Sequence, residues 1–237
     1  MTVALNDGQL DGPGTFPGGS SVTVATAGGS FTWRESTVYT YPKYQAPGVL
    51  LASGVPANAT RVWTDWVDGE TSLLGKGPAT LAHWYPNGSW TPKITLQNAQ
   101  GKASAGNAAT LTVAEDTTAP WVTVDVPAAP NRAGSWSTIS GRAGDGESGP
   151  DVVGVELWRF NGTTEYYYDF AARRWVKDTG GELPYSAQGL AGVDSGGSWR
   201  MPSSGLVKGY TFEVWYSAWD KVGNSTEPAH TSYYLSS

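Results

Sequence analysis

The sequence has no cysteine, only two histidines and few charged residues. Without thiols, the chain cannot contain a cysteine nucleophile, a disulfide or a cysteine-bound metal. Because eukaryotic secreted β-domains often carry disulfides, this absence favours a bacterial or viral origin. Charged residues make up 15% of the chain, well below the ~25% of an ordinary soluble domain. The net charge of −6, with no cluster of lysine and arginine, argues against nucleic-acid binding.

Long apolar runs are also missing. No segment approaches the ~18 consecutive apolar residues of a membrane-spanning helix, so we expect no membrane insertion. The first residues, MTVALNDGQLDGPG, lack the basic start and the apolar core of a signal peptide. Two interpretations remain: a signal was removed and a methionine added, or the protein is made and assembled inside a cell.

The abundant residues favour short strands and tight turns. The chain has 31 glycines, 15 prolines, 12 tryptophans and 12 tyrosines. No window shows the apolar i, i+3, i+4, i+7 pattern of a helix. From Phe31 to Val113, alternating or β-rich segments are separated by glycine, proline or asparagine. The sequence therefore predicts an all-β protein.

Residues 1–29 form an N-terminal arm rich in Gly, Pro, Ser and Thr, with one short alternating piece at 21–26. One interpretation is a flexible leader with a single edge strand. The other is an extended arm that adds a strand to the sheet of a neighbouring subunit, which would make the protein a homo-oligomer.

Two motifs between 62 and 113 are specific enough to suggest a family. The first is Asp65-Trp66-Val67-Asp68-Gly69; the second comprises His83-Trp84-Tyr85, Gly88, Trp90, Ile94, Leu96, Asn98 and Gly101. Together they resemble the PKD-type (polycystic-kidney-disease-type) immunoglobulin-like domain. The chain departs from that pattern at Val67, where the family has glycine, and at Pro92, inside an expected strand. We therefore expect an altered turn at the first position and an edge or bulge at the second.

The same resemblance bears on catalysis. It places His83 at a strand end, where it packs and forms hydrogen bonds, and His230 has no companion motif. No G-x-S-x-G, P-loop, HExxH or dinucleotide-binding motif is present. We therefore expect that the protein is not an enzyme.

The pattern restarts after a polar segment that ends in proline. Ile139-Ser140-Gly141, Asp145 and 218–224 (AWDKVGN) resemble a bacterial immunoglobulin-like repeat. That resemblance implies a spacer or adhesive unit of a secreted, cell-surface or phage virion protein. The segment EYYYDFAARRWV, between 161 and 200, predicts an added hairpin.

These observations combine into one architecture: two immunoglobulin-like β-sandwiches in tandem, preceded by an extended arm. The predicted boundaries are 1–29 for the arm, 30–114 for the PKD-like sandwich, 115–120 for a linker and 121–237 for the second sandwich with its inserted hairpin.

Strand parity predicts a candidate binding surface in the second sandwich. Because side chains alternate along a strand, Glu156 and Trp158 lie on the face opposite to the apolar residues of 151–160. Glu213, Trp215 and Trp219 do the same on 210–220. If the two strands are neighbours, they present an aromatic stripe to a sugar or a partner subunit. Alternatively, the added hairpin folds back and covers the stripe as a small second core.

Acidic loops raise the question of calcium. Asp145, Glu147 and Asp151 lie in GDGESGPD, and Asp220 closes the strand opposite. These loops could meet at one end of the sandwich and offer oxygen ligands to a hard cation. The alternative is that the carboxylates only cap turns through backbone amides. No other cofactor is expected.

Two functions follow from these expectations. The first is a non-catalytic structural and interaction protein on a virion, as a capsid decoration or minor tail protein, or on a cell surface, with protein subunits as partners. The second is a carbohydrate-binding accessory module of a secreted bacterial enzyme or adhesin, with a surface glycan as partner. Both rest partly on family resemblance.

Overall fold

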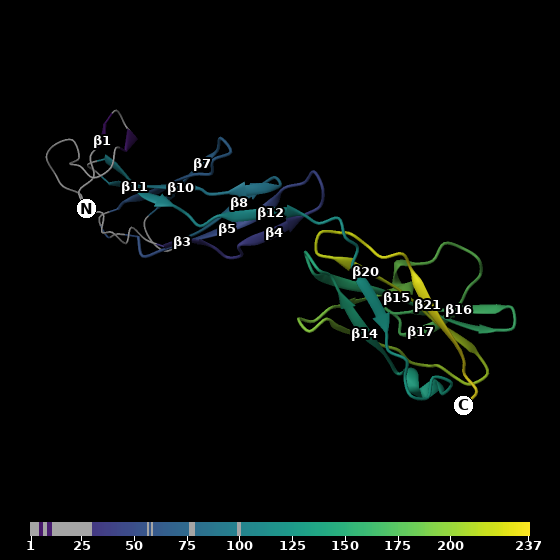
Figure 1. Ribbon diagram of the computed structural model, residues 1–237. Helices are drawn as coiled ribbons and strands as arrows, with labels where there is room; N and C mark the ends of the chain where they lie inside the picture. Colours follow the sequence, from purple (N-terminus) through teal and green to yellow (C-terminus); the bar gives the residue numbers. More distant parts are fainter. Residues whose placement is uncertain are drawn as a thin grey trace. The chain divides into compact units, whose positions relative to one another are not determined.

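The computed structural model describes residues 5–6, 9–10, 30–55, 57, 59–75, 79–98 and 101–237. Most of the predicted arm, including the expected strand at 21–26, lies outside these residues. The chain is all-β, as predicted, and divides into two compact units, 1–115 and 116–237 (Figure 1). The division falls inside the predicted linker 115–120. Asp116 is not a linker residue in character, because it is fully buried within the second unit.

Unit 1 contains twelve described strands. They are β1 (Leu5–Asn6), β2 (Gln9–Leu10), β3 (Ser30–Trp33), β4 (Thr37–Thr40), β5 (Ala46–Ser53), β6 (Arg61–Asp65), β7 (Thr71–Gly75), β8 (Ala79–Tyr85), β9 (Gly88–Trp90), β10 (Lys93–Asn98), β11 (Gly101–Asn107) and β12 (Leu111–Glu115). The main sheets are β11-β10-β6-β7 and β3-β5-β8, with a third, β4-β12-β9. β1 and β2 pair only with each other among the described strands.

The sheets of unit 1 enclose one core. β5 alternates buried and more exposed residues along its length, which is the period-2 pattern of a strand with one face packed inward. Trp33, Leu50, Val62, Ile94 and Leu111, each from a different strand, belong to the same buried cluster. β4 pairs in parallel with β12, whereas the other pairs in the unit are antiparallel. Since β12 is the last strand of the unit, this parallel pair joins a strand near the start of the sandwich to its end.

Both predicted irregularities of unit 1 turn out differently. Pro92 lies between β9 and β10 rather than inside a strand, and its carbonyl accepts a hydrogen bond from the Ala108 N–H. Val67 has a φ of 61°, the left-handed conformation that favours glycine. The turn therefore has a glycine-type backbone at Val67, and this β-branched residue accommodates it.

Unit 2 contains nine strands and two short 3-10 helices. They are β13 (Trp121–Val124), η1 (Ala133–Trp136), β14 (Thr138–Gly144), β15 (Pro150–Asn161), β16 (Thr164–Asp169), β17 (Arg174–Lys177), η2 (Tyr185–Ala187), β18 (Gln188–Gly192), β19 (Ser198–Pro202), β20 (Thr211–Asp220) and β21 (Ala229–Tyr234).

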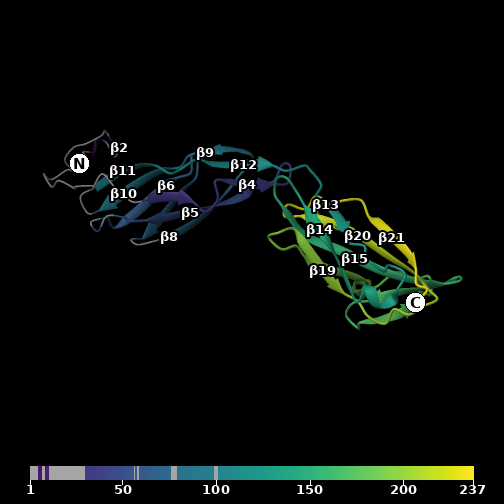
Figure 2. The same cartoon turned by 60° about the horizontal axis from the view of Figure 1, so that its bottom comes forward.

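Two sheets form the sandwich of unit 2. One has the order β13-β14-β19 and the other β17-β16-β15-β20-β21, with β18 also pairing with β15 (Figure 2). The strands β13, β14 and β19 correspond to strands A, B and E of an immunoglobulin-like sandwich, and β15, β20 and β21 correspond to C, F and G. Ile139, Trp199, Leu157 and Phe212 come from both sheets and share one buried core.

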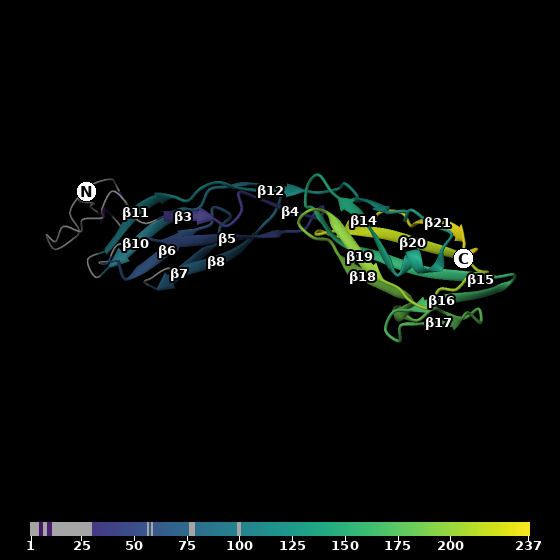
Figure 3. The same cartoon turned by 90° about the horizontal axis from the view of Figure 1, so that it is seen from below.

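The predicted hairpin exists as β16 and β17. Its strand β16 pairs edge to edge with the end of β15, with Trp158 opposite Tyr167 (Figure 3). The hairpin therefore extends the sheet and does not lie across the face that carries Trp158. Trp175, on β17, instead contacts Tyr168 and Phe212 of the core.

Candidate functional site

The predicted aromatic stripe lies on the outward face of the larger sheet of unit 2. β15 and β20 are neighbours, with Glu156 opposite Trp215 and Trp158 opposite Glu213. The alternate residues Val155, Leu157 and Val214 are fully buried, so the predicted parity is correct. We call the following ring-bearing residues of this surface the aromatic face: Trp158, Phe160, Tyr167, Trp215, Trp219 and His230.

Neighbouring strands bring these rings together. Trp215 stacks on His230 of β21 with their centroids 4.2 Å apart and their planes at 16°. Trp158 stacks on Phe160 at 6.4 Å and meets Tyr167 edge-on at 6.3 Å. None of Phe160, Tyr167 and His230 was predicted from the sequence. The alternation that places Trp158 also places Phe160 on this face, whereas Tyr167 and His230 depend on strand register.

Gly154 allows Trp219 to lie close over β15. A Cβ atom at position 154 would lie 2.7 Å from Cζ3 of Trp219 and 3.2 Å from Nε2 of Gln188. Only a residue without a side chain leaves room for the indole ring in this position. The glycine therefore keeps this end of the aromatic face close to the strand.

Polar groups accompany the rings. The indole N–H of Trp215 donates to Oε2 of Glu213 at 3.0 Å. Glu156 lies opposite both Trp215 and Gln188 in the sheet. The three tryptophans and both glutamates are half-buried. The surface can therefore offer ring faces for stacking together with carboxylate and amide groups for hydrogen bonding.

The predicted cation ligands assemble only in part. Asp145 and Asp220 lie together with Asp116, and one carboxylate oxygen of each lies within 4.8 Å of the others. We call these three residues the acidic cluster. Asp116 is 0% and Asp220 3% exposed, while Asp145 is half-buried. Asp151 is exposed and outside the cluster; its carbonyl accepts from the Val193 N–H.

Backbone amides hold the acidic cluster in place. Asp220 Oδ1 accepts from the N–H groups that follow it in the chain, which explains the spacing of the AWDKVGN motif. Asp145 Oδ2 accepts from Glu147 and Gly149. Asp116 accepts from the Thr118 N–H and, across the loop, from the Ser148 N–H. Each carboxylate of the acidic cluster therefore caps a turn, but turn capping leaves the proximity of three carboxylates unexplained.

The surroundings of Asp116 favour its ionised form. Burial raises the pKa of Asp116, but hydrogen bonds from Ser148 and Thr118 outweigh burial and hold it below its ordinary value. A side-chain hydrogen bond with Asp116 raises the pKa of Glu147, and the charges of Asp116 and Asp145 add to this effect. Glu147 is fully exposed at the edge of this negative region. From the sequence, Asp116 falls in the predicted linker, because no local pattern shows which loops meet.

His83 lies within the packing of unit 1. Its Nε2 and Oδ2 of Asp68 are joined by a 2.6 Å hydrogen bond, and its ring stacks on Trp66 at 4.6 Å and 3°. The hydroxyl of Tyr85 donates to the Trp66 carbonyl at 3.1 Å. Burial raises the pKa of Tyr85, and the charges of Asp68 and Asp65 add to the effect. These contacts give His83 a packing and hydrogen-bonding role, as the sequence analysis expected.

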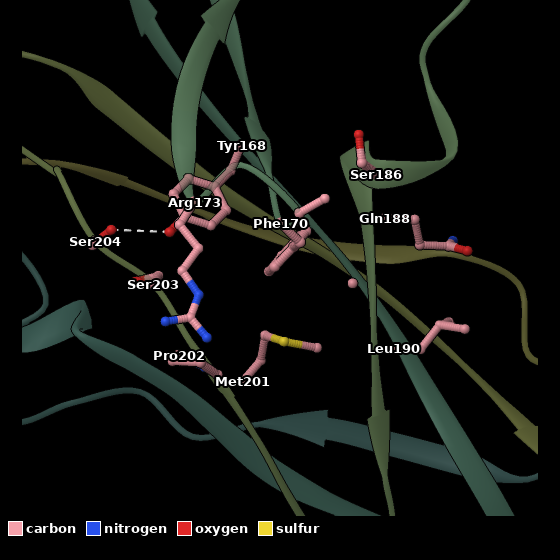
Figure 4. Close-up of a pocket in the computed structure, with 12 residues that line it drawn as sticks. Tyr168, Phe170, Arg173, Ser186, Gln188, Leu190, Met201, Pro202, Ser203 and Ser204 are labelled. Carbon is pink, nitrogen blue, oxygen red and sulfur yellow. Dashed lines mark hydrogen bonds between the residues drawn. The ribbon is translucent and has the colours of Figure 1, made fainter.

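One pocket was not anticipated from the sequence. It has a volume of about 520 Å³ and lies between the β16–β17 turn, β18 and β19 (Figure 4). Phe170, Met201 and Leu190 contribute apolar surface, and Arg173 contributes a cationic group. At one side the hydroxyls of Tyr168 and Ser204 are 2.9 Å apart. The pocket depends on three segments distant in sequence, so no local pattern could have indicated it.

Comparisons with known proteins leave the family open. No protein-family model and no curated protein matches the sequence. Among solved structures, the chain is similar to fibronectin(III)-like modules of CbhA from Clostridium thermocellum, at 12% identity over 87% of this chain and 94% of that chain, with a TM-score of 0.35. It is also similar to a purple acid phosphatase from yellow lupin (Lupinus luteus) seeds, at 9% identity over 86% of this chain and 41% of that chain, with a TM-score of 0.27. The immunoglobulin-like assignment rests on the strand order described above.

No helix among the described residues is long and apolar enough to cross a membrane.

Proposed function

We propose that this chain is a non-catalytic interaction protein of an extracellular or virion surface, and that it binds its partner through the aromatic face. The observation that carries the proposal is the gathering of six rings on the outward side of one sheet. Monomeric proteins seldom leave such surfaces without a role. Leu190 and Tyr234, 63% and 62% exposed, extend the apolar surface from the adjoining strands β18 and β21.

The PKD-like motifs of unit 1 and the bacterial immunoglobulin-like motifs of unit 2 support the surface placement. On that resemblance, the chain is a capsid decoration or minor tail protein of a phage. Its partners are protein subunits, and the N-terminal arm joins neighbouring copies. The low charge content, negative net charge and missing cysteines agree with this placement.

A carbohydrate-binding accessory module is the second candidate, and one observation favours it. Glu213, Glu156 and Gln188 lie beside the tryptophans, so ring faces and hydrogen-bonding groups occur on one surface. Sugars require that combination, since their C–H faces stack on aromatic rings while their hydroxyls need polar partners. A purely apolar contact between subunits does not require the carboxylates.

The aromatic face is tested with Trp215→Ala and Trp158→Ala, with Tyr185→Ala as the matched control. Tyr185 is fully exposed and is not part of the aromatic face. We expect both tryptophan variants to reduce binding at least tenfold and Tyr185→Ala to leave it unchanged. Binding is measured on a glycan array and on particles purified from the organism that encodes the chain. Loss on glycans alone supports the accessory module, and loss on particles alone supports the virion protein. Unchanged binding in both tryptophan variants would contradict the proposed surface.

The arm is tested separately by light scattering of the full chain and of a version lacking residues 1–29. An oligomeric mass for the full chain and a monomeric mass for the truncated version would support a subunit connector. Monomeric masses for both would show that the arm is only a leader.

A further inference from the structure

The acidic cluster concentrates negative charge where the protein can least tolerate it. Asp116 and Asp220 are withdrawn from solvent, and an oxygen of each lies within 4.8 Å of one from Asp145. Like charges this close repel, and the repulsion grows as water is excluded. Buried charges are normally paired with a charge of opposite sign or bound to a metal. An arrangement of this kind therefore calls for a cation.

No side chain of the described chain supplies that cation. The ion pairs found among the described residues involve only His83 of unit 1, so neither lysine nor arginine pairs with the cluster. Lys221 follows Asp220 directly, and its ammonium lies beside Gly149, whose N–H donates to Asp145, but it forms no ion pair with a described carboxylate. Hydrogen bonds from backbone amides disperse part of the charge without neutralising it.

A second, independent observation points to a missing ligand. Oδ1 of Asp145 is shut off from solvent and accepts no hydrogen bond, while Oδ2 of the same carboxylate accepts two. Buried polar atoms are almost always satisfied, so each exception requires an explanation such as an ion. A bound cation would satisfy the free carboxylate oxygen directly.

We propose that the acidic cluster binds a calcium ion, with carboxylate ligands from Asp116, Asp145 and Asp220. Calcium takes oxygen ligands at about 2.3–2.6 Å, so two of its ligands can lie up to about 5 Å apart. Separations within 4.8 Å meet that limit throughout. Calcium also tolerates irregular coordination geometry, whereas magnesium, with ligands at about 2.0–2.1 Å, demands a near-ideal octahedron. Water completes the coordination on the side where Asp145 is partly exposed.

The ion joins three segments of unit 2 that are distant in sequence. Asp116 is its first residue, Asp145 begins the loop between β14 and β15, and Asp220 ends β20. A ligand that binds only the folded state stabilises it in proportion to the logarithm of its concentration. Calcium therefore acts as a structural tie of unit 2, and its release loosens the chain before β13.

The experiment compares thermal unfolding and calorimetric titration of the full chain in CaCl₂, in MgCl₂ and in EGTA. We expect calcium at a hundredfold excess over its dissociation constant to raise the melting temperature of unit 2 by at least about 5 °C. Magnesium at the same concentration should have a clearly smaller effect. Terbium luminescence sensitised by tryptophan gives a second readout, because Trp219 adjoins Asp220.

Asp145→Asn separates a cation site from simple turn capping. The amide keeps an acceptor for the loop N–H groups but removes one charge and one ligand. In EGTA this variant should be at least as stable as the wild type, since a repulsive charge is gone, and it should lose the calcium-dependent shift. Asp194→Asn is the matched control: Asp194 caps an exposed turn of unit 2 through Gly196 and Ser198, so its calcium response should equal that of the wild type.

Three results would overturn the proposal. The first is a wild-type melting temperature and titration indifferent to calcium up to about 10 mM, the weak end of extracellular calcium sites. The second is an Asp145→Asn variant that binds calcium like the wild type. The third is an equal loss of stability in this variant in EGTA and in calcium, which would leave turn capping as its only role.

Discussion

Val67 offers a sharp test of the backbone of unit 1. It has a φ of 61° in the turn between β6 and β7, and its side chain is 39% exposed. In this conformation the Cβ atom of an L-residue crowds the following carbonyl, at a cost of about 1–2 kcal/mol. Asp65 helps to hold the turn, since its Oδ1 accepts from the Val67 N–H at 2.9 Å. Because the hydrogen bond uses only the backbone of Val67, substitutions at this position preserve it.

The informative comparison is Val67→Gly against Val67→Ala. Both remove the isopropyl group, so lost packing cancels between them, and only alanine keeps the strained Cβ. The glycine variant avoids the strain of about 1–2 kcal/mol. It loses about 0.5–1 kcal/mol of folding free energy, because its unfolded chain has more conformational freedom. We therefore expect Val67→Gly to be more stable than Val67→Ala by about 0.5–1 kcal/mol.

Hydrogen exchange followed by mass spectrometry measures this difference, because peptides from β6 and β10 report on unit 1 alone. Val207 is the control position, since it is 47% exposed and lacks a positive φ. There, peptides from β15 and β20 should show the opposite order, with alanine more stable than glycine by a similar amount. If Val67→Ala proves equal to or more stable than Val67→Gly, the left-handed assignment at this turn is wrong.

Three further predictions concern single residues. Gly141→Ala should destabilise unit 2 by about 2–4 kcal/mol, because its Cβ would lie 1.8 Å from the Thr123 carbonyl oxygen. The control is Gly192→Ala, where the space is open. A urea midpoint of Gly141→Ala no lower than that of the control would refute this. Burial raises the pKa of Asp68, but hydrogen bonds from His83 and from the Glu70 N–H, together with the charge of His83, outweigh burial and lower that pKa below 3.8. The stabilisation is therefore present above pH 3.8 and is lost as the pH falls through the lowered value. Asp68→Asn should unfold with a shallower acid dependence, and identical acid profiles would contradict the pairing. The Arg159 guanidinium lies over the rings of Tyr166, Trp175 and Tyr210 at 4.8–4.9 Å and donates to the Gly205 carbonyl. Arg159→Met should lower the free energy of unfolding by about 1–2 kcal/mol. An unchanged urea midpoint would show that the cation is dispensable.

Local sequence patterns were sufficient for the elements and their faces. The outward positions of Glu156, Trp158 and Trp215 follow from alternation along a strand, which is set by the backbone itself. The hairpin at β16 and β17 could be predicted for the same reason, from two β-rich runs around a turn. The placement of that hairpin could not be predicted, because its sequence is compatible both with edge-to-edge pairing and with folding over the sheet.

By itself, the sequence determined an all-β chain of two units, since strand alternation and turn residues act over a few positions. Only the tertiary structure decided which loops meet and which strands lie in register. Register brings His230 onto Trp215 and Tyr167 onto Trp158. The packing of unit 2 buries Asp116 beside Asp145 and Asp220. The physical reason is that these contacts join residues far apart in the chain, and the free energy that selects them comes from closing the whole core.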